Sequence, residues 1–328
     1  MSKWLTRRAS TGRLYFPMDS GDIVDKSGYT MTDSESTLVS DQIDAYDGRV
    51  PNFMIAGEQK AGTGYLYANL RRHPEVFMTV VKEPLFFSKP NFDSNNLSGY
   101  LREHFGTARN ERWVGEASAS YFHAEKAAPR IKEAFGSEMK FIIPLRHPTE
   151  KAVSLYLHNY RRHRLRGDEG VLGVEKTPFP IRKFASHSQE CARFLDLFGP
   201  PNIHFLLFDT LRSSPSAFVE GALSFLGLKA VRAPLPKVIN KGNDLHWGGD
   251  YLTIADTELP SAEQVRPRFR KAELESLHES FQKDVERTER ITGLDLSSWK
   301  CFPYIVPLLA FIFDVLDIVP DFWTDVLM

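Results

Sequence analysis

The sequence has few cysteines, almost no net charge and no hydrophobic run long enough for a comfortable membrane span. Its two cysteines, Cys191 and Cys301, are far apart and fit no metal-ligand spacing, which argues against a disulfide framework and a zinc site. The 41 basic residues balance the 42 acidic ones, so we expect neither a nucleic acid nor an anionic membrane as partner. No apolar run of signal-peptide length follows the positive charges at the start, which predicts a cytoplasmic protein.

The composition divides the 328 residues into three parts. Residues 1–50 are rich in Ser, Thr, Asp and Gly and show no periodicity, which predicts a flexible tail. Residues 51–300 are long enough for one large domain with a substantial core. Residues 301–328 form an apolar helical pattern with four aspartates on one stripe. We expect this last part to cover a surface or form a homo-oligomer contact; peripheral membrane contact is the alternative.

Short apolar runs alternate with helical patterns throughout the central part of the sequence. Buried strands are predicted at 53–56, 76–81, 113–115, 141–145 and 203–208, and helices at 65–72, 124–135, 150–161, 189–198 and 216–226, with a charged helix from about 263 to 292. This alternation predicts an α/β fold with a parallel sheet covered by helices on both faces. In such folds, ligands bind beyond the carboxyl ends of the strands.

A glycine-bearing loop follows the first predicted strand of this domain, with the sequence Lys60-Ala61-Gly62-Thr63-Gly64-Tyr65. A loop at a helix N-terminus presents backbone N–H groups to an anion, and Lys60 adds a positive charge. The first two glycines, Gly57 and Gly62, have the spacing of a nucleotide-binding P-loop, but Thr63-Gly64 stands where that motif has Lys followed by Ser or Thr. The lysine lies before the glycine instead, which argues against a nucleoside triphosphatase.

This arrangement resembles the 5′-phosphosulfate loop of sulfotransferases that use 3′-phosphoadenosine 5′-phosphosulfate (PAPS), over about residues 51–299. The resemblance implies that residues 60–65 wrap the 5′-phosphosulfate. A second motif, Arg146-His147-Pro148 with a later Ser154, is similar to the 3′-phosphate motif of the family, in which Asp is usual at the position of His147. The resemblance assigns binding of the 3′-phosphate to Arg146 and Ser154. The segment Lys241-Gly242 resembles the family loop that closes over the nucleotide.

The segment Lys82-Glu83-Pro84-Leu85-Phe86-Phe87 is similar to a segment of glycosaminoglycan-type and bacterial sulfotransferases whose glutamate is the general base. The resemblance therefore assigns the base to Glu83 and the stabilisation of the leaving oxygen to Lys60, with Lys82 as a second candidate. His123 is the rival base, because the sulfotransferases of small phenols and steroids use a histidine. No metal is required by this scheme.

The sequence allows more than one class of acceptor. The acceptor is a small molecule or a carbohydrate, and the sulfuryl group is added to a hydroxyl or an amine. The cationic segment Arg161–Arg166 is either a solvated face or part of an acceptor-binding rim. Two other functions remain as alternatives to a sulfotransferase. One is a P-loop kinase or NTPase, and the other is a noncatalytic nucleotide-binding scaffold.

Overall fold

The computed structural model describes residues 42–43, 46–176, 180–232, 235, 245–254 and 264–302, and the short strands at 16–17, 23–24 and 30–31. Those three strands, β1 (Phe16–Pro17), β2 (Ile23–Val24) and β3 (Thr30–Met31), pair antiparallel within the predicted N-terminal tail. Lys241, Gly242 and all but two residues of the predicted C-terminal extension lie outside the described residues. No helix within the described ranges is long and apolar enough to span a bilayer.

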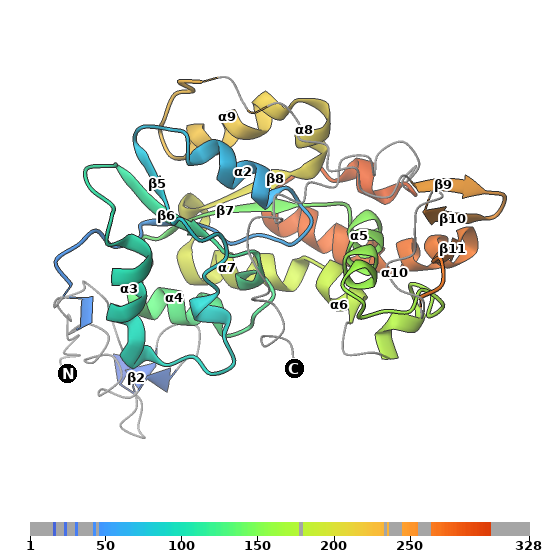
Figure 1. Cartoon of the computed structure of the whole chain (residues 1–328), viewed down its shortest axis with the longest axis horizontal. Helices are drawn as coiled ribbons and strands as arrows, with labels where there is room; N and C mark the ends of the chain where they lie inside the picture. The colour runs from blue at the N-terminus through green and yellow to red at the C-terminus, as the bar shows by residue number, and fades with distance from the viewer. Residues whose placement is uncertain are drawn as a thin grey trace, which may run out of the picture.

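A five-stranded parallel sheet forms the centre of the molecule (Figure 1). Its strands are β4 (Phe53–Ile55), β5 (Val76–Met78), β6 (Trp113–Ala117), β7 (Lys140–Leu145) and β8 (Ile203–Leu207), in the spatial order β5-β6-β4-β7-β8. All three residues of β4 and five of the six in β7 are buried, because helices cover both faces. The apolar runs at 53–56 and 141–145 therefore correspond to strands buried on both sides.

The helices form one layer on each face of the sheet (Figure 1). Helices α2 (Thr63–Leu70), α8 (Phe208–Ser213) and α9 (Pro215–Phe225) pack on one face around a core that includes Phe53 and Ile55. The opposite layer contains α3 (Leu97–Phe105), α4 (Ala127–Phe135), α5 (Pro148–Arg161), α7 (Ser188–Phe198) and α10 (Lys271–Thr292), and α6 (Ile181–Ala185) packs on α5. The predicted α/β architecture with a sheet covered on both faces is confirmed.

Short 3₁₀ helices connect several of these elements: η1 (Phe86–Ser88), η2 (Ser94–Asn96), η3 (Ala119–Tyr121), η4 (Gly173–Lys176), η5 (Pro200–Asn202) and η6 (Ser297–Lys300). Trp299 in η6 is buried and donates its indole N–H to Asp209 at 3.0 Å. This contact joins the end of the described domain to helix α8.

A small antiparallel sheet of β9 (Leu245–Gly248), β10 (Tyr251–Ile254) and β11 (Arg268–Arg270) lies beside the main sheet (Figure 1). The prediction of a helix beginning near residue 263 is wrong at its start, since α10 begins only at Lys271. The preceding strand β11 pairs with β10 and buries Phe269 between two exposed arginines. This alternation of exposed and buried residues is typical of a half-buried strand. The strand is only three residues long and directly precedes a long charged helix, so the sequence pattern does not separate the two.

Strand order determines where the ligand site lies. The first strand of the sheet, β4, lies between β6 and β7, so the chain runs to the β5 edge, returns through β6 and then continues on the other side of β4. Ligands of open α/β sheets bind where the order reverses, beyond the carboxyl ends of the strands. The predicted site residues Lys60, Glu83 and Arg146 all follow such strand ends.

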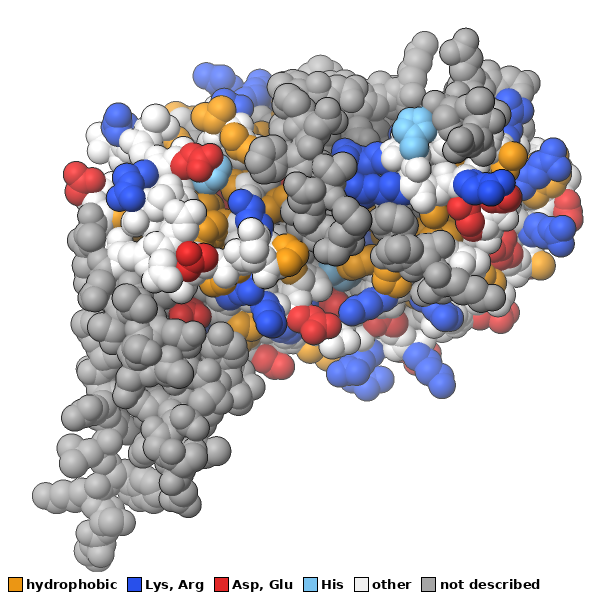
Figure 2. Space-filling model, turned by 60° about the horizontal axis from the view of Figure 1, so that its bottom comes forward, with side chains coloured by type: hydrophobic (Ala, Val, Ile, Leu, Met, Phe, Trp, Pro, Cys, Tyr) orange, Lys and Arg blue, Asp and Glu red, His pale blue; other side chains and the backbone are white. Residues whose placement is uncertain are grey.

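The surface agrees with the balanced charge of the sequence. On the face drawn in Figure 2, Lys and Arg side chains lie among hydrophobic patches with carboxylates between them. Side chains of both signs occur on this face among the described residues, so we expect an anion site to be local.

Candidate active site

The glycine loop, residues 57–62, turns the chain from β4 into helix α2. A Cβ at Gly57 would lie 2.6 Å from the Cα of Ile143, so only glycine permits this close approach to β7. Gly62 has φ of 92° and caps α2, and a Cβ there would lie 2.6 Å from Cδ2 of Leu211. Lys60 also adopts a left-handed conformation, with φ of 68°. A lysine in this region is strained, and such strain persists only where surrounding contacts hold it.

Arg146, directly after β7, provides that contact. Its Nη1 donates to the carbonyl oxygen of Lys60 at 3.1 Å, and its Nε donates to Glu150 at 3.3 Å. The guanidinium stacks over Phe208 at 4.5 Å, and Arg146 is 1% exposed. Burial lowers the pKa of Arg146 and the Glu150 carboxylate opposes the shift, but an arginine stays charged.

Several buried donors of this region have no hydrogen-bond partner among the described residues, and two of them bear on the 3′-phosphate motif. They are Nη2 of Arg146 and Oγ of Ser154, which lies on α5 nearly two turns after Pro148 and is 1% exposed. Buried polar groups are almost always paired, so such orphaned donors mark a place where a ligand is expected to bind. The structure therefore leaves the two residues assigned to the 3′-phosphate ready to donate.

His147 replaces the usual aspartate of the motif without loss of its capping function. It is the N-cap residue of α5, and its Nδ1 accepts a hydrogen bond from the N–H of Thr149 at 3.2 Å. Burial lowers the pKa of His147 to about 4, so its ring is neutral at pH 7 and can accept this bond. The hydrogen bonding of the turn is thus retained by a different side chain.

Glu83 is held against the carboxyl end of β6. Its N–H donates to the carbonyl oxygen of Ala117 at 2.9 Å, and its φ of 66° is a second strained non-glycine conformation. Lys82 donates to Oε1 of Glu83 at 2.6 Å, while Oε2 is buried without a hydrogen-bond partner in the described structure. One carboxylate oxygen is therefore available to an incoming proton donor.

A second buried carboxylate, Glu116, lies close behind this position and was not singled out from the sequence. It accepts hydroxyl hydrogen bonds from Tyr100 at 2.5 Å, Tyr121 at 2.9 Å and Ser118 at 2.6 Å. Burial raises the pKa of Glu116, and the hydroxyl donors oppose that shift. Because Ser118 Oγ also accepts from the N–H of Leu85 at 3.1 Å, the carboxylate supports the segment that carries Glu83.

The sequence reading also missed the buried charge network around Glu58 of the glycine loop. Glu58 is fully buried and accepts hydrogen bonds from the N–H of Arg146 at 2.8 Å, from Nε2 of His187 at 3.0 Å and from Nζ of Lys151. Burial alone would raise the pKa of Glu58, but the charges of His187 and Lys151 outweigh it and hold the pKa below its usual value. His187 in turn lies 3.8 Å from Asp284 of α10, so the network reaches three helices.

His123, the rival base, belongs to the edge of this network. Lys151 donates to its Nε2 at 3.0 Å, and its Nδ1 lies 3.6 Å from Glu190. Burial, reinforced by the charge of Lys151, holds the pKa of His123 well below its usual value. The ring is neutral, and the nitrogen that could accept a proton already accepts from a lysine, so the geometry favours Glu83 as base.

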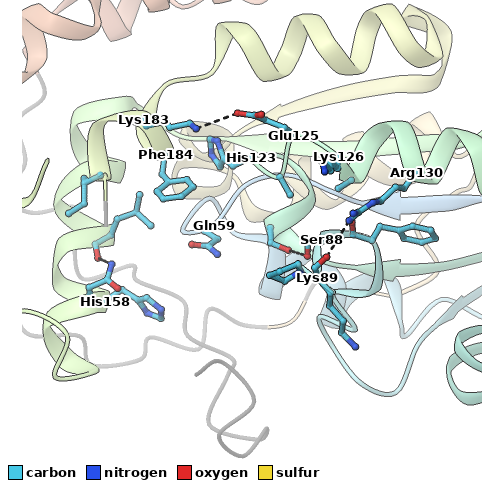
Figure 3. Close-up of a pocket in the computed structure, with 18 of the residues that line it drawn as sticks. Gln59, Ser88, Lys89, His123, Glu125, Lys126, Arg130, His158, Lys183 and Phe184 are labelled. Carbon is cyan, nitrogen blue, oxygen red and sulfur yellow. Dashed lines mark hydrogen bonds and ion pairs between the residues drawn. The ribbon is translucent and has the colours of Figure 1, made fainter. Parts of the chain in front are cut away.

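A cavity of about 480 Å³ opens beside the glycine loop (Figure 3). Gln59 of the loop and His123 line it, together with residues of α4, α5, α6 and the segment after Glu83. The cationic segment Arg161–Arg166 contributes Arg164 to the lining, whereas Arg166 is exposed and pairs with Asp168 at 3.7 Å. No three His, Cys, Asp or Glu side chains of the described residues group as metal ligands.

Comparison with known proteins identifies the family of this fold and site. The model of the family described as "Sulfotransferase domain" matches residues 50–295, which is 246 of the 328 residues. The chain belongs to the sulfotransferase family. The predicted family membership, and with it a sulfotransferase enzyme, is confirmed.

A solved relative and two curated human relatives illustrate the likeness. The crystal structure of a sulfotransferase from Alicyclobacillus acidocaldarius superposes with a TM-score of 0.58 at 27% identity, covering 77% of this chain and all of the other. Human bifunctional heparan sulfate N-deacetylase/N-sulfotransferase 2 is 29% identical over 205 residues, 55% of this chain and 22% of that protein. Human heparan sulfate glucosamine 3-O-sulfotransferase 6 is 29% identical over 194 residues, 56% of this chain and 54% of that protein. The chain thus spans about a fifth to a half of these curated relatives.

Proposed function

We propose that this sulfotransferase moves the sulfuryl group of PAPS to a hydroxyl or amine of its acceptor. The observation that supports this proposal most is the pair of orphaned buried donors, Nη2 of Arg146 and Oγ of Ser154. A nucleotide with a separate 3′-phosphate gives both donors an acceptor oxygen. ATP lacks that phosphate and leaves them unpaired, at a desolvation penalty of about 1–3 kcal/mol for each group.

The donor nucleotide would lie across the carboxyl ends of β4 and β7. Its 5′-phosphosulfate would accept from the backbone N–H groups at the start of α2, in the segment Lys60–Tyr65, where the helix dipole favours an anion. Its 3′-phosphate would lie on Arg146 and Ser154. Lys241 and Gly242, outside the described residues, keep their proposed role in closing over the nucleotide.

The transfer step needs a base on the acceptor and a cation on the leaving group. The free Oε2 of Glu83 takes the proton of the acceptor hydroxyl as the acceptor oxygen attacks sulfur. The bond between sulfur and the 5′-phosphate oxygen breaks, and adenosine 3′,5′-bisphosphate (PAP) leaves with the electron pair. The Nζ of Lys60 neutralises the charge that develops on the leaving oxygen.

Three further assignments belong to this proposal. Residues 51–300 form the catalytic unit, the protein acts in the cytoplasm, and the reaction needs no metal. The relatives named for heparan sulfate act, by their names, on that polysaccharide. A carbohydrate or a small molecule is therefore the class in which an acceptor is to be sought.

The substitution Glu83→Gln tests the base. We expect the turnover number for sulfuryl transfer to fall by about 10²–10⁴-fold, because the amide cannot accept the proton. PAP affinity should stay within about threefold, since the contacts proposed for the nucleotide come from residues 60–65, Arg146 and Ser154 and do not include Glu83. Glu103→Gln, on an exposed glutamate of α3 with 73% of its side chain accessible, is the matched control.

Wild-type turnover in Glu83→Gln would refute the assignment. Isothermal titration with PAP and with ATP-Mg²⁺ separates the donor assignment from the base assignment. The proposed site binds PAP tightly and ATP weakly; tight ATP binding would favour the kinase or NTPase alternative.

A further inference from the structure

The cavity beside the glycine loop is lined by more positive than negative side chains. Among the described residues, five Lys or Arg side chains and one carboxylate line it. These residues are Lys89, Lys126, Arg130, Arg164 and Lys183, against Glu125. Glu125 is already paired with Lys183 at 3.4 Å, so this carboxylate of the lining has a cation partner of its own.

Three of the five cations gather on one side of the cavity. In Figure 3, Lys89, Lys126 and Arg130 lie together on one side, Gln59 lies near the middle, and His158 and Phe184 lie on the other side. Arg130 is fixed in place, because it donates to the carbonyl oxygen of Phe87 at 2.8 Å and stacks over Phe92 at 4.2 Å. Neither Lys89 nor Lys126 forms an ion pair with a described carboxylate. A rigid guanidinium flanked by two such ammonium groups favours binding of an anion.

The rest of the lining is largely apolar. Its hydrophobic side chains come from four separate elements and surround the space: Phe87, Pro90, Ala124, Ala127, Leu155, Ile181 and Phe184. Phe87, Ala127, Leu155 and Ile181 are buried in the core, so these walls are set by the fold. Apolar walls with a few polar groups at fixed points are typical of small-molecule pockets.

The part of the cavity nearest the assigned transfer site follows from chain connectivity. Gln59 lines the cavity and directly precedes Lys60, the residue assigned to the leaving oxygen. Ser88 and Ser120 line the neighbouring wall and share a hydrogen bond of 2.8 Å. An acceptor that fills the cavity would therefore bring its nucleophile to Gln59 and its far end to the cationic side.

We propose that the acceptor is a small amphipathic acid: a hydroxyl or amine at one end, an apolar or aromatic body, and one carboxylate or other anionic group at the other end. This inference rests on the proposed function, since it takes the cavity as the acceptor site. The volume of about 480 Å³ is that of a pocket for a single drug-sized molecule, not a groove for a chain of sulfated sugars. The acceptor class thus differs from the polysaccharide in the names of the human relatives.

Pairs of matched acceptors test whether the acceptor is a small amphipathic acid. The probes are 4-hydroxyphenylacetate, 3-(4-hydroxyphenyl)propanoate and 4-(4-hydroxyphenyl)butanoate, each beside its neutral primary amide, and an N-desulfated heparin hexasaccharide. Transfer from PAPS is measured by the mass gain of one SO₃. We expect kcat/KM for the best acid to exceed that for its amide about tenfold or more, the effect of one charge-assisted contact.

Charge-removing variants connect this preference to the cationic side. Lys126→Gln and Lys89→Gln should each reduce the acid-to-amide ratio several-fold. Lys132→Gln, also on α4 but outside the cavity lining, should keep the wild-type ratio. Titration of each acid into the protein with PAP bound gives the same ranking without turnover.

The outcomes separate this inference from the function on which it rests. Equal use of acids and amides, or preference for the hexasaccharide, would overturn the acceptor class and leave the sulfotransferase intact. Tight PAP binding with no transfer to any acid would also count against the class. Absence of PAP binding would overturn the proposed donor site itself.

Discussion

The salt bridge between Lys151 and Glu58 holds the glycine loop against helix α5. Both side chains are fully buried, and Lys151 also donates to His123 at 3.0 Å. Burial lowers the pKa of Lys151, and the negative charge of Glu58 opposes the shift. Lys151→Met keeps the length and apolar stem of the side chain but removes the ammonium group. The Glu58 carboxylate then loses one of the two cations that compensate its burial.

Removing one partner of a buried ion pair costs about 3–5 kcal/mol, because the remaining charge stays in the interior without compensation. We expect the free energy of unfolding to fall by roughly this amount in Lys151→Met, a large part of the 5–15 kcal/mol typical of a domain. Glu58→Gln should also destabilise the protein, since it leaves Lys151 uncompensated. The double variant leaves no charge unpaired between the two, so its loss should be smaller than the sum of the single losses.

Urea unfolding followed by circular dichroism measures these differences, and PAP titration reports whether the loop keeps its shape. The matched control is Lys271→Met, because Lys271 lies in an exposed pair with Glu275 at 3.8 Å. We expect that control to change stability by less than about 1 kcal/mol. A loss below about 1 kcal/mol in Lys151→Met, or strict additivity in the double variant, would refute this account of the network.

Three further predictions concern the loop and the 3′-phosphate motif. Because the pKa of His147 falls from about 6.5 in the unfolded chain to about 4 in the fold, its contribution to stability is lost as pH falls from 6.5 to 4. Over that window, His147→Asn, which keeps a capping acceptor, should lose about 3 kcal/mol less than wild type in urea unfolding. Arg146→Lys should weaken PAP binding about tenfold to a hundredfold by calorimetry, since lysine cannot contact the Lys60 carbonyl and a phosphate in the same fork. Gly62→Ala should cost about 1–3 kcal/mol by urea unfolding, because its φ of 92° and the nearby Leu211 both oppose a Cβ.

The sheet and the loop were predictable because their signals are local. A parallel strand buried on both faces is a continuous apolar run, and the turn that follows needs glycines at fixed positions. The predicted strand at 53–56 and helix at 65–72 correspond to β4 (Phe53–Ile55) and α2 (Thr63–Leu70). Arg146 was placed at a strand end by the same logic, and the structure brings it to the Lys60 carbonyl.

The charge network around Glu58 could not be predicted, because its members come from distant parts of the chain. Lys151, His187 and Asp284 lie on α5, at the start of α7 and on α10. No spacing in the sequence relates them to a glutamate in a loop at residue 58. The same holds for Glu116, whose hydroxyl partners become visible as a set only when α3 and η3 pack against β6.

Three consecutive loop residues show how local sequence signals and long-range contacts of the fold act together. Glu58 is held in the interior by buried charges, Gln59 lines the cavity proposed for the acceptor, and Lys60 presents its carbonyl to Arg146. Arg146 contacts the loop on both sides, through its own N–H to Glu58 and its Nη1 to Lys60. A change in the Glu58 network must therefore move Gln59 and Lys60 together. The proposed donor and acceptor sites share this loop, so we expect weakening of the network to raise the KM values for both substrates and not for PAPS alone.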